Sequence, residues 1–382
     1  MSRKILVTGA RAPVALEWCR ALSNLGYLVY CADSLRLNLT RFSNSVEKFF
    51  FLPEPSSKPR EYIKAINSIC DRYGINLVLP TCEEIFYLAW GKNDINSNTE
   101  VLSNGIELLR RIHSKYEFSH LVEKMSISCP ETYRLCSRDQ LKSYFDSCKD
   151  YVFKPEYSRF ATETLIQPSV KELASIKISP MKPWVAQIHV EGTEYATCGF
   201  ANHGELVFNS IYRPMYRFGK GSGTYFSPVT KPKIDVFVRN FCKRYEIHGQ
   251  IGFDFIEDHS GNIFVLEGNP RTTSGIHLIK PRLNLSDSAI RQQRSRVKSP
   301  SMIAAATLLS RLVFRFPHMF SIAFWQDFFV ARDVVYSRKD RFPSVAQYFC
   351  FFEILLRAIL RYKKLTSAAT HDIEWNGDRI GP

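Results

Sequence analysis

The chain has 382 residues, 45% of them hydrophobic and 23% charged, which excludes a disordered chain and leaves room for two or three domains. Lys and Arg outnumber Asp and Glu by 51 to 37, and the net charge of +14 favours anionic partners. The ten cysteines include no CxxC pair, which argues against a zinc site and for reduced thiols. No signal peptide and no apolar run of about 18 residues are visible, so we expect a cytoplasmic protein without a membrane-spanning segment.

The chain opens with a predicted strand, helix and strand. They span Lys4–Thr8, Val14–Leu25 and Gly26–Asp33. Such a βαβ unit suggests a dinucleotide site. However, Gly9 is followed by Arg11, Pro13 and Ala15 rather than by further glycines, so close backbone approach to a pyrophosphate is not assured. We therefore favour an architectural unit over a nicotinamide site.

The next predicted strand, Asn76–Thr81, is followed by two adjacent acids, Glu83 and Glu84. Ligands of open α/β sheets collect beyond the carboxyl ends of the strands, which makes both acids candidates to hold a cationic group of a substrate. The alternative is that they are acids at a helix N-terminus, favoured there by the helix dipole.

The short strand Tyr151–Pro155 carries Lys154 between apolar residues. A lysine in such a position is costly unless it meets an anion. The loop that follows contains Ser158, Arg159 and Thr162, whose hydroxyls and guanidinium are suited to covering phosphates, although the loop lacks glycines.

A second basic loop, RPMYRFGKGSG, spans Arg213–Gly223. Its glycines and cations suit a phosphate-covering role, and Arg213 and Lys220 are candidates to contact the substrate. A solvated hairpin tip is the alternative.

The stretch Ile251–His277 reads as a β-hairpin with its turn at Ser260-Gly261. That turn places Asp254 opposite Glu267, and period-two alternation puts Asn269 on the same face. Oxygen ligands on one patch suit a hard cation such as Mg²⁺, while a solvated strand face is the alternative. We expect the opposite face to fill the core with Phe255, Phe264 and Leu266. His277, just past the hairpin, is expected to be structural or adjacent to the substrate.

From Ser286 onward the chain is basic, with 15 Lys and Arg against 8 Asp and Glu, and helices are predicted from Met302 to Lys364. One predicted helix face carries Phe349, Phe352, Leu356 and Ile359. A basic, aromatic amphipathic helix is suited to peripheral contact with an anionic membrane, and packing on its own domain is the alternative. The tail Thr370–Gly377 has no readable role.

Taken together, these segments resemble the ATP-grasp superfamily, in its carbamoyl-phosphate-synthase-like and amino-acid-ligase-like branch. The motifs that carry the resemblance are VFKP, QIHVEGTEY, FDFIED and FVLEGNPR. The resemblance implies an α/β and α+β chain with the ATP-grasp fold. A Rossmann-like pre-ATP-grasp domain would span residues 1–110. The ATP-grasp domain would span 111–285, with a lid at about 130–190, and 286–382 would form a helical C-terminal extension.

The resemblance also implies roles for single residues. Lys115 and Lys154 would contact nucleotide phosphates, with Ser158 and Arg159 in the covering loop. Gln187 and Val190 would line the adenine hinge, and Glu194 would bind the ribose. The remaining implied residues are the Mg²⁺ or Mn²⁺ ligands Asp254, Glu267 and Asn269 and the catalytic Arg271, which would approach the transferred phosphate beside Lys154.

The implied function is an ATP-dependent carboxylate–amine ligase that forms a C–N bond through an acyl phosphate. ATP, a carboxylate and an amine would be its partners, without nucleic acid, and a homodimer stays open. The alternatives are a bicarbonate-using carboxylase or carbamoyl-phosphate-type enzyme, and a non-catalytic nucleotide-binding protein with membrane-surface contact.

Overall fold

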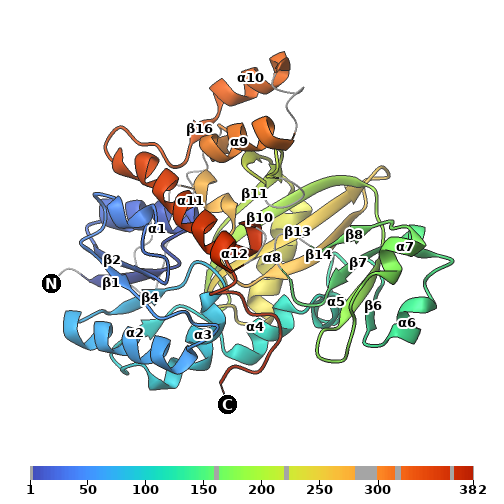
Figure 1. Cartoon of the computed structure of the whole chain (residues 1–382), viewed down its shortest axis with the longest axis horizontal. Coiled ribbons are helices and arrows are strands. Elements are labelled where there is room, and N and C mark those ends of the chain that lie inside the picture. The colour runs from blue at the N-terminus through green and yellow to red at the C-terminus, as the bar shows by residue number, and fades with distance from the viewer. Residues whose placement is uncertain are drawn as a thin grey trace.

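The computed structural model describes residues 3–158, 163–218, 223–279, 299–314, 320–361 and 365–381. In this part of the chain the strands form three sheets, with helices packed around them (Figure 1). The first sheet consists of the N-terminal strands, and the second is a small sheet formed by the strands that follow in sequence. The third is a long, mainly antiparallel sheet that extends into the C-terminal quarter.

The N-terminal sheet is parallel throughout, in the order β3-β2-β1-β4-β5. Its strands are β1 (Lys4–Thr8), β2 (Leu28–Asp33), β3 (Lys48–Phe51), β4 (Leu77–Leu79) and β5 (Glu100–Val101), connected by α1 (Pro13–Asn24), α2 (Pro59–Tyr73) and α3 (Glu84–Trp90). β1 lies at the centre and is buried, which explains its continuous apolar run. The predicted βαβ unit is confirmed, with α1 starting at Pro13 because proline suits the first helical position.

The second sheet, which we call the lid sheet, is antiparallel and has the order β6-β9-β7-β8. It consists of β6 (Thr132–Leu135), β9 (Trp184–Ile188), β7 (Tyr151–Pro155) and β8 (Leu165–Ile166), with α6 (Arg138–Lys142) and α7 (Val170–Ala174) beside it. Phe153 and Ala186 fill its small core, so Lys154 projects from the other face of β7.

The third sheet, which we call the long sheet, has seven strands in the order β14-β13-β10-β11-β12-β15-β16. They are β14 (Ile263–Asn269), β13 (Gly249–Asp258), β10 (Gly192–Asn202), β11 (Glu205–Pro214), β12 (Tyr225–Pro228), β15 (Ser301–Met302) and β16 (Arg332–Asp333). The C-terminal quarter therefore adds two short strands to this sheet. Its described helices are α9 (Ala304–Phe314), α10 (Ile322–Val330), α11 (Phe342–Leu360) and α12 (Leu365–Ala368).

Three helices pack on the long sheet near β13 and β14: α8 (Pro232–Arg244), α4 (Ile106–His113) and α5 (Lys115–Val122). A Cβ atom at Gly268 would lie 2.8 Å from Ile112 and 2.9 Å from Phe118, so glycine permits this close approach. Ser114 caps α5 by accepting a hydrogen bond from the backbone N–H of Glu117 at 3.1 Å. The start of α5 is thereby fixed beside the end of β14.

The β13–β14 hairpin differs from the predicted one in its turn but not in its central pair. Near the turn Glu257 pairs with Ile263, one residue out of the predicted register, and a bulge after Asp254 restores the pairing of Asp254 with Glu267. The bulge also changes which side chains face the core. Val265 is fully buried, whereas Phe264 and Leu266 are only partly buried, so the prediction that these two fill the core was wrong.

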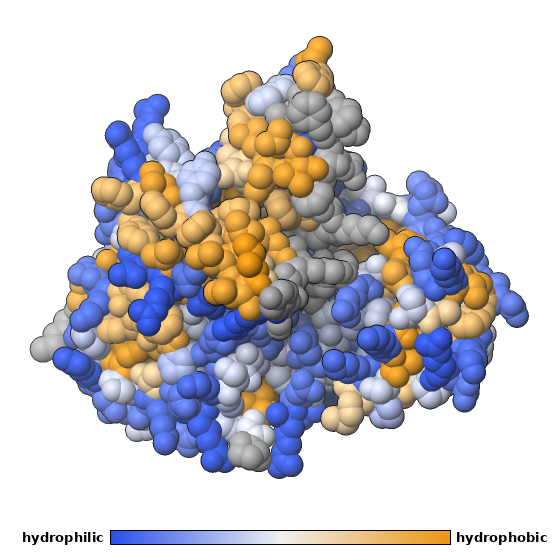
Figure 2. Space-filling model, viewed as in Figure 1, coloured by the Kyte–Doolittle hydropathy of each residue, from blue (hydrophilic) through white to orange (hydrophobic). Residues whose placement is uncertain are grey.

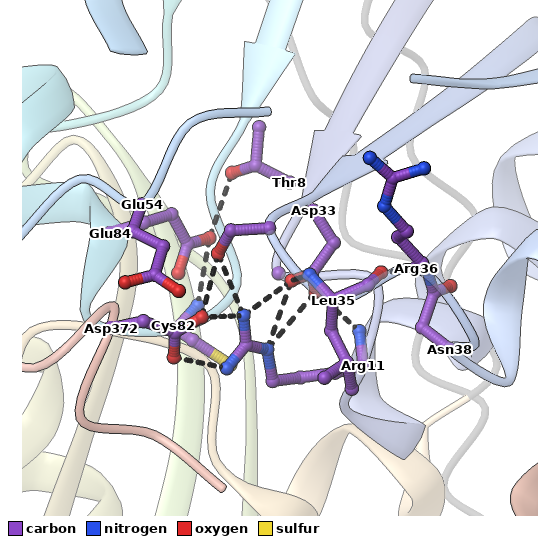
Figure 3. Close-up of polar contacts among 12 residues, drawn as sticks. Thr8, Arg11, Asp33, Leu35, Arg36, Asn38, Glu54, Cys82, Glu84 and Asp372 are labelled. Atoms are coloured by element: carbon purple, nitrogen blue, oxygen red, sulfur yellow. Dashed lines mark hydrogen bonds and ion pairs between the residues drawn. The ribbon is translucent and has the colours of Figure 1, made fainter. Parts of the chain in front are cut away.

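The end of the chain closes the N-terminal sheet through one buried ion network (Figure 3). The guanidinium of Arg11, in the loop after β1, donates to Asp33 at the end of β2 and to Asp372, whose side chain is fully buried. Arg357 of α11 donates to the same Asp372 carboxylate at 3.0 Å. Burial alone would raise the pKa of Asp372, but the charge and hydrogen bonds of Arg11 lower it well below its ordinary value.

Trp375 follows this network and inserts into the core of the N-terminal sheet, with 3% of its surface exposed. Its ring stacks on Phe86 with a centroid distance of 4.8 Å and meets Tyr157 edge-on at 5.0 Å. The tail Thr370–Gly377, for which the sequence showed no role, therefore has a structural one. It forms a strap that packs the end of the chain against the N-terminal sheet.

One described helix, α11, is long and apolar enough by length and composition to cross a membrane. Glu353 and Arg357 lie within this helix, so the sequence has no uninterrupted apolar run of about 18 residues even though the average hydropathy of α11 is high. Only 22% of its most apolar window is buried.

The Asp372→Asn variant should lower the melting temperature at neutral pH. Removing one partner of a buried ion network costs roughly 3–5 kcal/mol, because the remaining charges of Arg11 and Arg357 lose their compensation. Since the pKa of Asp372 is lowered in the folded state, its stabilising effect exists above the ordinary value of about 3.9 and disappears as the pH falls through the lowered value.

Thermal melts of the wild type and the variant across acidic and neutral pH would measure this, with the exposed Asp146→Asn as the matched control. A variant that melts with the wild type at neutral pH would contradict the role of Asp372.

Candidate active site

The centre of the candidate site is the pair Asp254 and Glu267, which face each other from β13 and β14. Asn269 shares their face and donates from Nδ2 to Asp254 Oδ2 at 3.2 Å. The Glu267 side chain keeps 29% of its surface exposed, so the pair is accessible from one side. The predicted convergence of these three side chains is confirmed.

The two carboxylates have opposite pKa shifts. Burial and the charge of Glu267 raise the pKa of Asp254. Burial opposes ionisation of Glu267 as well, but the charges of Lys115 and Lys154 lower its pKa. Like charges this close stay ionised together only beside positive charge. The two carboxylates can therefore be ionised together only because positive charge lies beside them.

Lys115, the first residue of α5, provides one of the neighbouring positive charges. Its Nζ lies 3.7 Å from Glu267 Oε2 and donates to Ser158 Oγ at 3.1 Å. Only 3% of the residue is exposed, and this burial lowers its pKa. Ser158 lies in the loop for which phosphate contacts were predicted, so one lysine joins that loop to the hairpin.

Lys154 provides the second charge from the lid sheet. Its Nζ donates to Gln187 Oε1 at 2.9 Å, and both residues are almost fully buried. The Gln187 amide donates in turn to Thr132 Oγ1 at 3.0 Å. A buried amine that is held by a neutral amide is costly unless an anion lies nearby, so this position suits a phosphate contact. The adenine-hinge role predicted for Gln187 stays a prediction, and its side chain is used to hold Lys154.

Arg271 lies directly after β14 and connects the carboxylate pair to the N-terminal sheet. Its Nη2 donates to Asn269 Oδ1 at 3.0 Å, and its Nε lies 3.6 Å from Glu83 Oε1. Glu83 is 1% exposed at the carboxyl edge of the parallel sheet. This ion pair brings two residues predicted from separate arguments into one place.

The other acid at that edge, Glu84, has a structural position. Its Oε1 accepts hydrogen bonds from Thr8 Oγ1 at 2.8 Å and from the Thr81 backbone at 3.0 Å, and burial raises its pKa. This geometry favours the helix N-terminal alternative for Glu84. His277 is fully buried 3.0 Å from Glu17, which likewise favours its structural alternative.

The remaining predicted residues lie on or beside the strands β9, β10 and β11. Val190 is partly buried between β9 and β10, Glu194 on β10 pairs with Arg217, and Arg213 is exposed on β11. Nothing in these positions tests their predicted roles. Arg159 and Lys220 lie outside the described residues.

Sequence reasoning missed two residues next to the site. Glu156, 1% exposed, accepts from Ser114 Oγ at 2.5 Å and from Arg134 Nε at 2.7 Å, so it ties the start of α5 to the lid sheet. His113 is buried against Phe86, and burial lowers its pKa to about 4. Only the position of Glu156 directly after Lys154-Pro155 could have drawn attention to it.

Comparisons with known proteins show the fold to which this geometry belongs. No family model matches the chain. An uncharacterized protein of Methanocaldococcus jannaschii is 22% identical over 174 residues, which are 45% of this chain and 43% of that protein, so the match spans less than half the relative's length.

Solved structures match more of the chain. The biotin carboxylase domain of the Hydrogenobacter thermophilus 2-oxoglutarate carboxylase, in complex with MgADP and bicarbonate, has a TM-score of 0.60 and 12% identity, covering 78% of this chain and 73% of that one. N5-carboxyaminoimidazole synthetase from Staphylococcus aureus has a TM-score of 0.60 and 12% identity, covering 83% and 87%. L-amino acid ligase from Bacillus licheniformis has a TM-score of 0.55 and 13% identity, covering 73% and 70%.

These three neighbours are ATP-grasp proteins. The chain has the ATP-grasp fold.

Within this ATP-grasp fold, the carboxylate pair passes a chemical test for a metal site. Two carboxylates and an amide carbonyl offer only oxygen ligands, which suit a hard divalent cation such as Mg²⁺. Among the described residues no group of three His, Cys, Asp or Glu side chains could hold a metal, so the third oxygen must come from Asn269 or from a phosphate.

Metal binding at this ATP-grasp site should depend on pH. A metal displaces the proton of Asp254, so affinity for Mn²⁺ should rise as the pH increases through the raised pKa of that group. Asp254→Asn should weaken Mn²⁺ binding at least about 10-fold and flatten the pH dependence, because the titrating ligand is lost.

Electron paramagnetic resonance titrations of Mn²⁺ with ADP present would measure both effects. The control is Glu257→Gln, on the same strand but paired with Lys231. An Asp254→Asn variant with wild-type affinity would show that the carboxylates do not bind the metal.

Proposed function

We propose that the chain is an ATP-dependent carboxylate–amine ligase that uses Mg²⁺ and releases ADP and phosphate. The observation that carries the proposal is the meeting of the Asp254–Glu267 pair with three cations, Lys115, Lys154 and Arg271, from three different parts of the fold. Phosphoryl transfer needs mainly positioning and charge neutralisation, which this set of side chains can supply.

In the first step, an oxygen of the substrate carboxylate attacks the γ-phosphorus of ATP. The bond from that phosphorus to the β–γ bridging oxygen breaks, so an acyl phosphate and ADP form. In the second step, the nitrogen of the amine attacks the acyl carbon, loses a proton, and expels phosphate. Divalent metal bound at the carboxylate pair supplies charge neutralisation and orientation of the phosphates.

The side chains take distinct parts in this reaction. Lys154 of the lid sheet and Lys115 of α5 hold phosphate oxygens from two sides, and their burial strengthens that attraction. Arg271 lies next to Asn269 and therefore next to the transferred phosphoryl group. Glu83 orients the Arg271 guanidinium, which makes it a positioning residue.

The substrate acid is proposed to enter between Arg271 and the carboxyl edge of the N-terminal sheet, where ligands of open α/β sheets collect. The structural neighbours support the ligase class through their fold, and they include both carboxylases and an amino acid ligase. Bicarbonate is therefore a necessary member of any substrate screen.

The proposal predicts ADP release when Mg²⁺-ATP, a carboxylate and an amine are supplied together. Glu267→Gln should lower this rate by at least about 100-fold, the scale on which single charge-stabilising groups contribute to catalysis. Lys154→Met should act similarly, because its ammonium is lost from the phosphate site. A coupled ADP assay across amino acids, other carboxylates and bicarbonate would measure both effects.

Hydroxylamine trapping distinguishes the classes, since an acyl phosphate gives a hydroxamate before any amine is added. Glu257→Gln serves again as the control and should keep the wild-type rate. ATP binding without ADP formation under every substrate combination would favour the non-catalytic alternative, and a strict bicarbonate requirement would favour the carboxylase alternative.

A further inference from the structure

The strongest feature outside the candidate active site is the outer face of α11. Its largest apolar side chains point away from the protein. Between 53% and 75% of their surface is exposed at Phe342, Val345, Tyr348, Phe349, Phe352, Ile359 and Leu360. Figure 2 shows apolar residues gathered over the region where Figure 1 places α11 and α9. A helix on the surface of a globular protein normally turns such residues toward the core.

The inner face of α11 carries small side chains and two charged ones instead. Its buried residues are Pro343, Ala346, Cys350 and Ala358. Its only two charged side chains, Glu353 and Arg357, are 16% and 15% exposed and point into the protein. Glu353 accepts from the Leu37 backbone at 2.6 Å, and Arg357 donates to the Ser34 carbonyl at 2.6 Å. The helix is therefore amphipathic in the inverted sense.

The helix α9 repeats this inversion, and α10 also exposes large apolar side chains, although it buries Phe324. In α9, Thr307 and Ser310 are buried while Leu312 and Val313 are 56% and 60% exposed. In α10, the one acid, Asp327, accepts from the Tyr216 hydroxyl. The outward residues of α10 and of the turn before it, each at least 66% exposed, are Phe320, Ile322, Phe329 and Val330.

Neighbouring helices that all expose large apolar side chains indicate a surface suited to apolar surroundings. Contiguous apolar patches on soluble monomers are small, and larger ones mark sites of interaction.

Basic residues border this surface. Arg338, Lys339 and Arg341 are exposed directly before α11, where cations are unfavourable for the helix because its N-terminal dipole end is positive. The helix itself therefore gives no reason for these cations, which lie exposed beside its apolar outer face. Arg36, whose backbone donates to Glu353, also lies over the ring of the half-exposed Phe51.

We propose that the outer face of α11, together with α9 and α10, docks the protein on the surface of an anionic lipid bilayer. The apolar side chains enter the boundary between headgroups and acyl chains, and the cations at the start of α11 pair with lipid phosphates. This surface is separate from the residues of the proposed ligase site, so the inference does not depend on the reaction.

The geometry assigns α11 to the membrane surface rather than to a membrane span. Glu353 and Arg357 join the middle of the helix to the N-terminal sheet, and Arg357 belongs to the network of Asp372. A spanning orientation would break these contacts and place both charges in hydrocarbon, which is costly. An orientation in the plane of the membrane preserves them.

The experiment is flotation of the full chain with vesicles of phosphatidylcholine alone or mixed with phosphatidylglycerol. We expect the protein to float with the mixed vesicles, and binding to fall with added salt because exposed charges are screened. The double variant Phe349→Glu/Phe352→Glu should bind at least about 10-fold more weakly, because its charges face the hydrocarbon. The triple variant Arg338→Gln/Lys339→Gln/Arg341→Gln should lose on the order of 10- to 100-fold.

The matched control is Val236→Glu, which places a charge at a 50% exposed apolar position of α8 and should bind like the wild type. Since Phe349 and Phe352 are exposed, their variant should melt with the wild type. Wild-type protein that floats with neither vesicle overturns the proposal. So does a double variant that floats normally, or one that only converts a lipid-indifferent dimer into monomers, which would assign the face to a second copy of the chain.

Discussion

Repulsion between Asp254 and Glu267, which face each other on neighbouring strands, is the constraint around which the site is arranged. Two carboxylates in this position require positive charge from elsewhere. The chain brings it from the start of α5, from the lid sheet and from the segment after β14. The same demand explains why Lys115 and Lys154 are tolerated in almost complete burial, since an ammonium without an anion nearby would be costly there.

Each cation has at least one neutral partner besides the acids that it contacts. Lys154 donates to an amide oxygen, Lys115 divides its contacts between Ser158 and Glu267, and Arg271 divides its contacts between Asn269 and Glu83. The neutral partners fix the position of a side chain without cancelling its charge. A site of this kind is pre-organised for a polyanion, because little reorganisation is needed when the anion arrives.

The C-terminal quarter is held to the rest of the molecule by buried ion pairs and hydrogen bonds. The charged residues of α11 point inward because Arg357 shares the buried Asp372 with Arg11 and Glu353 binds the Leu37 backbone. Once these charges are used on the inner face, the large apolar residues of the same helix have only the outer face left. The anchoring of the strap and the apolar outer surface are therefore two consequences of one arrangement.

Local patterns in the sequence determined much of the fold. Apolar segments identified β1 and β7, and the turn with period-two alternation placed Asp254 opposite Glu267 on one face, because side-chain direction along a strand follows from backbone geometry alone. The predicted turn was one residue out of register, and a bulge compensated for it. The bulge moved Val265 into the core in place of Phe264 and Leu266, since it depends on packing against α8 that no local pattern reveals.

The sequence by itself determined which residue types could bind a metal and phosphates, and which segments are strands. Only the tertiary structure decided that Glu83 meets Arg271, that Asp372 closes on Arg11, and that α11 turns its charges inward. These contacts join segments far apart in the chain, and their partners are chosen by burial and charge in three dimensions rather than by spacing along the sequence.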